Sequence, residues 1–384
     1  MIRVWRKLWA RKFRFQGPLA LLAVGLSLIV FSNHSFNASA TDAGQKSDKL
    51  MVKAVVVTMF EIGKDTGDAP GEFQTWAERE QFNQVYELPT AYHDALVNDK
   101  GLLGIVTGIG TAKSATSIMA LGSDPRFDLT KAYWLVAGIS GIDPNDGSLG
   151  SAAWAKWVVD ADLAHEIDAR EIPSEWPYGY LPLYTRAPNS TPTENAGEAY
   201  QLNPRLADWA YQLTKDVELD DSPEMADYRT IYTDYPNAQK PPFVLMGDNL
   251  SGGTFWHGKL LNQWANDWVK LWSNDEGNYV TTAQEDTGTL QALTNLAKAG
   301  KVDLNRVMVL RTASNYDSQG INQTAAESLN RETEILGDSF AGFLPSLEAA
   351  YRVGSTVIHN ILDNWDIYAQ KLPVLDSLLD DSQQ

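Results

Sequence analysis

The sequence predicts a mixed α/β fold, in which helices cover the faces of a central sheet, and three observations support this prediction. The chain has 384 residues, and 44% of them are hydrophobic, which is enough to bury a large core. From Lys49 onward, short apolar runs alternate with segments whose apolar residues recur at helical spacing. Several of these runs end in glycine or small polar residues, and in an open α/β sheet ligands collect beyond the carboxyl ends of the strands.

Apolar runs in the first half of the chain predict four strands. They cover residues 49–60, 101–110, 132–141 and 152–168, and the last run carries polar residues at its far end. Residues 111–122 directly follow the second run, are rich in Ala and Ser and end in glycine, so they predict a helix.

The second half of the chain continues the alternation. Residues 241–249 and 301–315 predict strands, and residues 254–272 and 343–362 predict helices with one apolar face.

Residues at about 182–242 differ from the rest, because they are rich in Pro, Asn, Asp and Tyr. They contain a short helical segment at 206–219, and their apolar content is too low for a separate core. We therefore expect a single domain over residues 49–384, with an insertion at about 182–242.

The first forty residues have the pattern of a secretory signal peptide. Six basic residues precede the apolar run 18–31, and the sequence Ala-Ser-Ala at 38–40 is a small-residue cleavage site. An uncleaved anchor helix is the alternative, although the run has about 14 residues and a membrane span needs about 20. We expect a signal peptide at 1–40, a polar linker at 41–48 and a soluble, exported protein that is periplasmic or extracellular.

Charge and cysteine content exclude several classes of function. The forty N-terminal residues hold six of the 31 basic residues and none of the 49 acidic ones, which leaves a net charge of −24 on the remainder. This argues against nucleic acid as a partner, since binding a polyanion depends on neutralising its phosphates. The lack of cysteine excludes disulfides, thiolate zinc sites and cysteine nucleophiles. We expect neither a metal nor a cofactor.

The segment VMVLRTASNYD, residues 307–317, begins as a buried strand and then becomes polar. One interpretation is that its polar end forms the rim of a pocket, and the other is that Ser314 and Asn315 cap the next helix. Gly108 and Gly110, in GIGTAKSA, raise a similar choice. A glycine pair before a helix shows only that the backbone turns tightly.

Taken in order, five motifs resemble those of the nucleoside phosphorylase and nucleosidase superfamily. They are GIGTAKSA, AGISG, WVVDADLAHEID, QEDTGTLQAL and RTASNYD. With VTMFEIG, MGDNLSGGTFWHG and the long stretch YWLVAGISGIDPNDGSLGSAAWAKWVVDADLAHEID, the chain resembles more closely the purine nucleoside permease family. The resemblance covers nearly all of residues 49–362. It implies a nucleoside phosphorylase-like, three-layer αβα fold with a central mixed, twisted sheet, and a purine nucleoside as ligand.

The resemblance also implies roles for single residues. Glu285 would bind the ribose hydroxyls, with Asp286 orienting it or capping the helix, and an exposed acid pair is the alternative. Asn315 and Ser314 would bind the base. An amide can hydrogen-bond N7 and a six-oxo group, but it cannot protonate N7 as an acid would. Asp317 could supply that proton if its loop turned inward.

Further pocket residues come from the same motifs. Phe255 and Trp256 could form an aromatic wall against the base, whereas the alternative is that Trp256 and His257 pack at the start of a helix. The remaining candidates lie in the glycine-containing turns and are Gly108, Gly110, Gly138, Ser140 and Gly141.

The reaction is left open by the resemblance. Glu61 would position water for hydrolysis, with Glu72 and Glu87 as weaker candidates. Phosphorolysis would need a cation before the glycine-rich loop, where residues 135–137 of this chain are Leu-Val-Ala. Arg311 could be recruited for phosphate, or it could pair with an acid. If the protein is an enzyme, hydrolysis is favoured over phosphorolysis.

Two functions therefore follow from the sequence. In the first, the exported protein binds purine nucleosides and serves their uptake, as the family name implies. Without a spanning helix it would need a membrane transporter as partner, and it could also form a homo-oligomer. In the second, it is a purine nucleosidase or phosphorylase that cleaves the N-glycosidic bond. An amide at Asn315, where a nucleosidase has an acid, favours the first function.

Overall fold

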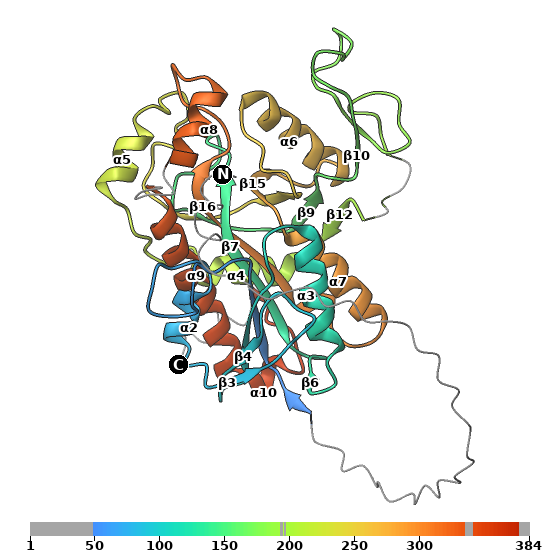
Figure 1. Ribbon diagram of the computed structural model, residues 1–384, viewed down its shortest axis with the longest axis vertical. Coiled ribbons are helices and arrows are strands. Elements are labelled where there is room, and N and C mark those ends of the chain that lie inside the picture. Colours follow the sequence, from blue (N-terminus) through green and yellow to red (C-terminus); the bar gives the residue numbers. More distant parts are fainter. Residues whose placement is uncertain (1–48, 193–194, 196, 335–340, 376–384) are drawn as a thin grey trace, which may run out of the picture. The chain divides into compact units, whose positions relative to one another are not determined.

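The computed structural model describes residues 49–192, 195, 197–334 and 341–375, which belong to one compact unit. The expected signal peptide and linker lie outside the described residues. Within these residues, twelve strands join in one large mixed sheet (Figure 1). The prediction of an α/β fold with a central mixed sheet is confirmed.

The sheet runs in the order β12, β9, β14, β15, β7, β2, β5, β4 and β3, and β16, β8 and β13 branch from it at β7. Strands β5, β2, β7 and β16 are parallel, whereas β15 is antiparallel to β7. The bounds are β2 (Ala54–Thr58), β3 (Gln84–Tyr86), β4 (Ala95–Val97), β5 (Leu102–Val106), β7 (Tyr133–Ile142), β8 (Ala152–Trp154), β9 (Trp157–Asp160), β12 (Ala199–Gln201), β13 (Val244–Met246), β14 (Asp248–Ser251), β15 (Tyr279–Ala283) and β16 (Val307–Tyr316).

Two short strand pairs and the helices complete the described fold. The pairs are β1 (Leu50–Met51) with β6 (Phe127–Asp128) and β10 (Ala164–Glu166) with β11 (Tyr180–Pro182). The helices are α2 (Gln74–Arg79), α3 (Thr111–Ser123), α4 (Pro204–Thr214), α5 (Pro223–Arg229), α6 (Lys259–Trp272), α7 (Asp286–Lys298), the 3₁₀ turn η1 (Leu304–Arg306), α8 (Ala325–Glu334), α9 (Phe343–Asp363) and α10 (Trp365–Tyr368).

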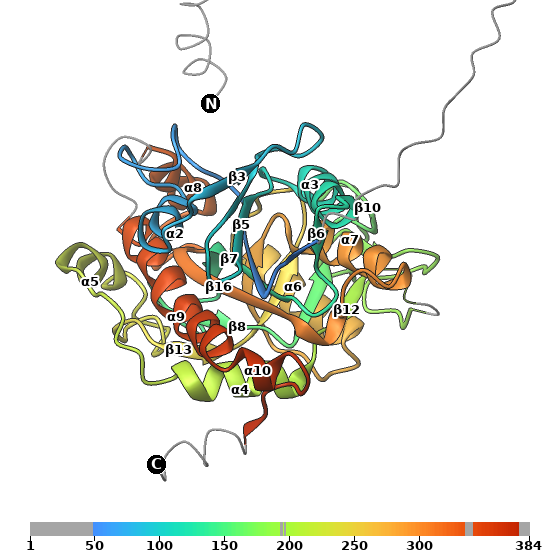
Figure 2. The same cartoon turned by 90° about the horizontal axis from the view of Figure 1, so that it is seen from below.

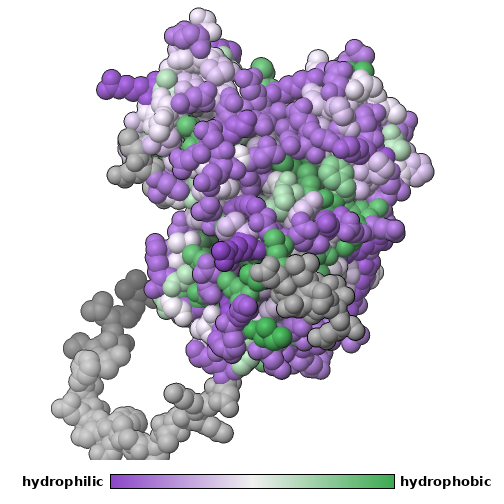
Figure 3. Space-filling model, turned by 180° about the vertical axis from the view of Figure 1, so that it is seen from behind, coloured by the Kyte–Doolittle hydropathy of each residue, from purple (hydrophilic) through white to green (hydrophobic). Residues whose placement is uncertain are grey.

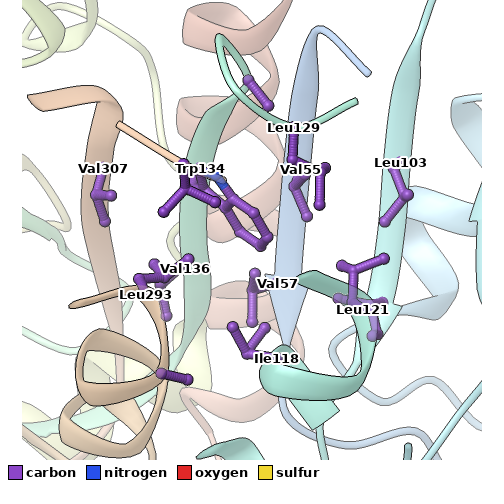
Figure 4. Close-up of a cluster of buried hydrophobic side chains, with 14 of the residues drawn as sticks. Val55, Val57, Leu103, Ile118, Leu121, Leu129, Trp134, Val136, Leu293 and Val307 are labelled. Atoms are coloured by element: carbon purple, nitrogen blue, oxygen red, sulfur yellow. The ribbon is translucent and has the colours of Figure 1, made fainter. Parts of the chain in front are cut away.

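Helices cover both faces of the sheet because successive residues of a strand point to opposite sides. Val55 and Val57 of β2 join the core on the side of α3 and α7, where Figure 4 shows Val57 beside Ile118 of α3 and Leu293 of α7 beside Val136 of β7. Ala54 and Val56 join the core on the other side, with residues of α2, α4 and α9. Figures 1 and 2 show α3 and α7 together on one side and α9 on the other. The described residues therefore form three layers, αβα.

The junction at β7 positions the site described below. One edge of β7 pairs with β16 along residues 134–142. The other edge pairs with β2 at residues 133–136 and with β15 at residues 141–142. Residues 137–140 have no strand beside them on this second edge among the described strands. The sheet therefore splits here, and side chains must satisfy the polar groups of that stretch of β7.

The strand predicted at 152–168 is broken into β8, β9 and β10. At the first break, Asp248 Oδ1 accepts hydrogen bonds from the main-chain N–H groups of Lys156 and Trp157, at 2.9 and 2.7 Å. The Asp248 carboxylate thus replaces hydrogen bonds to a neighbouring strand at the point where the chain passes from β8 to β9. Hydrophobic periodicity could not show the break, since the flanking residues on both sides are buried.

The segment at about 182–242 is integrated into the fold. Its strand β12 pairs with β9, and Leu206 and Trp209 of α4 lie in the same core as α9.

The surface is largely polar on the face that Figure 3 shows, where hydrophobic residues form patches between larger hydrophilic areas. Among the residues that the structure describes, no helix combines the length and the apolar character needed to cross a membrane.

A close approach between α3 and α7 gives a test of the packing. A Cβ at Gly288 would overlap the main-chain carbonyl oxygen of Thr111. We expect Gly288→Ala to lower the free energy of unfolding by about 1 to 3 kcal/mol, because the two helices cannot separate without opening the core. In the control Gly253→Ala, the new Cβ would lie 3.6 Å from its nearest neighbour. Chemical denaturation measures both variants, and equal losses would contradict this view of the interface.

Candidate functional site

Arg311 lies in the middle of β16, and its side chain is 1% exposed. Its Nε donates to both carboxylate oxygens of Asp286, at 3.2 and 3.1 Å, and its Nη2 donates to Asp286 Oδ2 at 2.8 Å. Nη2 also donates to Glu285 Oε2 at 3.3 Å, and Nη1 donates to the main-chain oxygen of Ile139 at 3.0 Å. The guanidinium therefore joins β16, β7 and the start of α7. Of the two roles expected for Arg311, the structure shows the pairing with an acid.

Asp286 is the principal counterion of Arg311. It is fully buried in the first turn of α7, where the helix dipole favours a negative charge. Asn249 Nδ2 also donates to Asp286 Oδ2, at 2.6 Å. Asp286 thus acts on Arg311 and not, as the alternative had it, as part of an exposed acid pair.

Glu285 precedes α7 and is also buried. Its Oε1 accepts from the main-chain N–H of Gly110, at 3.2 Å, and its Oε2 accepts from Arg311 and from the main-chain N–H of Gln284. Burial raises the pKa of Glu285, the Arg311 guanidinium opposes this, and the Asp286 carboxylate adds to it. Gly110 has φ of 97°, a value that favours glycine. The tight turn before α3 thereby brings its main-chain N–H to Glu285.

Glu72 satisfies the part of β7 that has no neighbouring strand. Its Oε1 accepts from the main-chain N–H of Ile139 at 2.8 Å, and its Oε2 accepts from that of Met59 at 2.6 Å. Burial raises the pKa of Glu72 to about 8, with Arg311 lowering it and Glu285 raising it. Burial thus favours the neutral acid at Glu72. We call Arg311, Asp286, Glu285, Glu72 and Asn249 the Arg311 cluster.

Gly138 makes room for this cluster. A Cβ at this position would lie 2.6 Å from Glu72 Oε1 and 2.7 Å from Arg311 Nη1. These distances are too short for any side chain, so glycine is required for both the Glu72 carboxyl group and the Arg311 guanidinium to approach β7.

Ser314 and Asn315 do not cap a helix, because they lie within β16. All ten residues of this strand are buried. Asn315 pairs in register with Gly141, which on its other edge pairs with Thr282 of β15. Ser314 Oγ donates to the main-chain oxygen of Ser140 at 3.1 Å and lies 2.9 Å from Asn315 Oδ1. Asn315, predicted to bind the base, thus lies on a strand of the junction, and Glu285, predicted to bind the ribose, follows β15, which pairs with β7 at the same junction.

Asp317 lies in a separate buried polar group. Its carboxylate accepts from Asn262 Nδ2, at 3.1 and 3.0 Å, and from the Tyr279 hydroxyl at 2.5 Å. Burial raises the pKa of Asp317 well above its usual value, and the nearby Asp143 adds to the rise. These contacts hold Asp317 away from the Arg311 cluster.

Glu61 has a different environment from the one expected. Its two oxygens accept from the main-chain N–H groups of Ile62, Gly71, Phe73 and Gln74, at 2.6 to 3.0 Å. The carboxylate therefore fixes the loop at the start of α2, and these four bonds fill the acceptor positions that a water would need. Glu72, one of the two weaker candidates from the sequence, is the acid that lies near Glu285.

The two aromatic candidates have different environments. Trp256 is buried, with its ring 6.0 Å from that of Trp264 and 6.1 Å from that of Tyr279, so it packs at the start of α6 as the alternative proposed. Phe255 is 52% exposed. In the described part of the chain, no group of three or more His, Cys, Asp or Glu residues could hold a metal ion.

Comparison with known proteins identifies the family. The model of the purine nucleoside permease family matches residues 51–373. The chain belongs to this family. A purine nucleoside permease of Candida albicans is 31% identical over 86% of this chain and 80% of its own length. A probable purine nucleoside permease of Schizosaccharomyces pombe is 34% identical over 69% of this chain and 76% of its own length.

Solved structures of nucleosidases are similar at a lower level. Futalosine hydrolase of Helicobacter pylori matches 80% of this chain and 98% of its own, at 14% identity and a TM-score of 0.48. The 5′-methylthioadenosine/S-adenosylhomocysteine nucleosidase of Neisseria meningitidis matches 81% and 99%, at 13% identity and a TM-score of 0.46. Likeness at this level says nothing about the ligand of this permease-family protein.

The raised pKa of Glu72 gives a test of the cluster. An acid whose pKa is higher in the folded protein holds its proton more tightly there, so stability falls as pH rises from about 4.5 to about 8. We expect Glu72→Gln to remove up to about 1.4 kcal/mol per pH unit of this slope, because glutamine does not titrate. Denaturation of both proteins at pH 5, 6, 7 and 8 measures the slopes. Parallel curves would show that Glu72 does not hold the proton.

Proposed function

We propose that this protein binds purine nucleosides outside the cytoplasm and serves their uptake. The observation that supports it best is the buried carboxylate of Glu285, which Gly110 and Arg311 fix beside β16, the strand that carries Asn315. Oε1 of Glu285 accepts one hydrogen bond, from the Gly110 N–H, so it retains a lone pair for a ribose hydroxyl. A carboxylate held in one orientation by charged and main-chain donors is suited to grip a diol.

Asn315 supports the assignment of a base. Its Nδ2 donates to the main-chain oxygen of Tyr316 at 3.0 Å, and its Oδ1 faces Ser314 Oγ. One N–H and one oxygen lone pair of the amide remain, and these match N7 and a six-substituent of a purine. A Cβ at Gly141 would lie 3.3 Å from Asn315 Nδ2, so glycine leaves space beside the amide.

The names of the relatives support the role in uptake. The Candida albicans and Schizosaccharomyces pombe proteins are called purine nucleoside permeases, and this chain matches most of their length. The pattern of the first forty residues supports export. In this proposal the protein captures the nucleoside and a membrane transporter moves it.

Hydrolysis of the N-glycosidic bond is the second candidate function, and Glu72 supports it. A carboxyl group with pKa of about 8, next to the proposed ribose ligand Glu285, can exchange a proton near neutral pH. With Asn315 unable to act as an acid, Glu72 is the group of the Arg311 cluster suited to proton transfer.

Incubating the purified protein with inosine, adenosine and guanosine, with and without phosphate, separates the two functions. Binding without release of base supports capture, and release without phosphate supports hydrolysis. Neither binding nor release of base with any of the three nucleosides would refute both.

Glu285 gives the sharpest mutational test of this proposal. We expect Glu285→Ala to weaken binding of the preferred nucleoside about 10- to 100-fold, because a charge-assisted hydrogen bond from the ribose is lost. Glu348→Ala is the matched control, since Glu348 also pairs with arginines, Arg79 and Arg352, but lies on the outer side of α9. Calorimetric titration measures both variants. Unchanged affinity in a folded Glu285→Ala protein would refute the ribose assignment.

A further inference from the structure

Arg311 is a buried cation next to Glu285, the proposed ribose ligand. The sequence has no cation in residues 135–137 of β7, but the structure places one on the neighbouring strand, in register with Gly138. The proposed site therefore contains a cation. If it binds nucleosides but not phosphate, the reason must be something other than a lack of positive charge.

The contacts of Arg311 supply another explanation. Its hydrogen bonds go to Asp286, Glu285 and the oxygen of Ile139, and they use four of its five N–H groups. Asp286 takes both Nε and one N–H of Nη2, which is the paired edge that binds a carboxylate or phosphate in bidentate fashion. Phosphate would have to displace Asp286 to bind this edge of Arg311.

Asp286 is itself fixed in place. It is 0% exposed, its Oδ2 accepts from Asn249 Nδ2 at 2.6 Å, and it begins α7. Asn249 is fully buried on β14, so its amide cannot follow Asp286 into solvent. Displacing the Asp286 carboxylate would leave a buried charge and a buried amide without partners, which is costly.

The charge balance acts in the same direction. Three buried acidic side chains, Glu72, Glu285 and Asp286, surround the single guanidinium of Arg311. An excess of acids over cations in a buried site opposes the entry of a phosphate anion more than that of a neutral nucleoside.

We propose that Asp286, held by Asn249, is the specificity-determining residue that directs this site to neutral nucleosides and bars inorganic phosphate by occupying Arg311. The proposal rests on the proposed function for its nucleoside and deepens it. It assigns the exclusion of phosphate to one carboxylate, which leaves water as the only nucleophile if the site is catalytic.

The test compares phosphate binding by the full-length protein and its Asp286→Asn variant in calorimetric titrations with inorganic phosphate. The variant keeps the size of the side chain and removes its charge. We expect the variant to bind phosphate about tenfold or more tightly than the wild type does. Arg311→Met in the Asp286→Asn background is the control, and the gain must disappear in it.

Asn249→Ala is the second variant, and it decides the matter if Asp286→Asn does not fold. It loosens Asp286 without removing its charge, so we expect a smaller gain in phosphate affinity in the same direction. Phosphate binding by the wild type, or no gain in a folded variant, would overturn the proposal. A gain that survives Arg311→Met would overturn it as well.

Titration of the wild type with inosine tests the proposed function separately. If no purine nucleoside binds but the Asp286-dependent gain is found, the nucleoside assignment fails and the control of Arg311 by Asp286 stands. If inosine binds and phosphate affinity is independent of Asp286, only the present inference fails.

Discussion

The buried guanidinium of Arg311 is the contact on which the site depends. The central strand β7 loses its neighbour between β2 and β15, and the polar groups at Ile139 are satisfied by Glu72 from the turn before α2 and by Arg311 from β16. A buried charge of this kind requires counterions, and Asp286 and Glu285 supply them from the start of α7. The split in the sheet and the orientation of Glu285 are thus parts of one arrangement.

The same arrangement explains why β16 begins apolar and ends polar. Its first residues fill the core between two helical layers, whereas Arg311 and the residues after it pass the split in the sheet. Polar side chains are needed there to pair the free edge of β7, and Glu72 and Arg311 bond its main chain at Ile139. In our proposal the nucleoside completes hydrogen bonds that the strands leave unfilled at Glu285 and Asn315.

Much of this was predictable from the sequence, and the failures have physical causes. The strands at β2, β5, β7 and β16 and the helices α3 and α9 follow from apolar runs and periodicity, and Glu285 and Asn315 follow from family motifs. The sequence favoured Glu61 over Glu72 as the acid of the site, but both flank the same loop, and only the fold decides which carboxylate binds the start of α2 and which meets β7. Asn249 gave no signal, since a single amide within a strand is not distinguished from its neighbours without its partner Asp286.

The most direct measurement is a crystal structure of the protein with inosine bound. Our account predicts the ribose hydroxyls within hydrogen-bond distance of the Glu285 carboxylate, the purine against the Asn315 amide, and the Arg311 to Asp286 pair intact. A nucleoside bound elsewhere on the protein, with Glu285 and Asn315 untouched, would contradict the central claim.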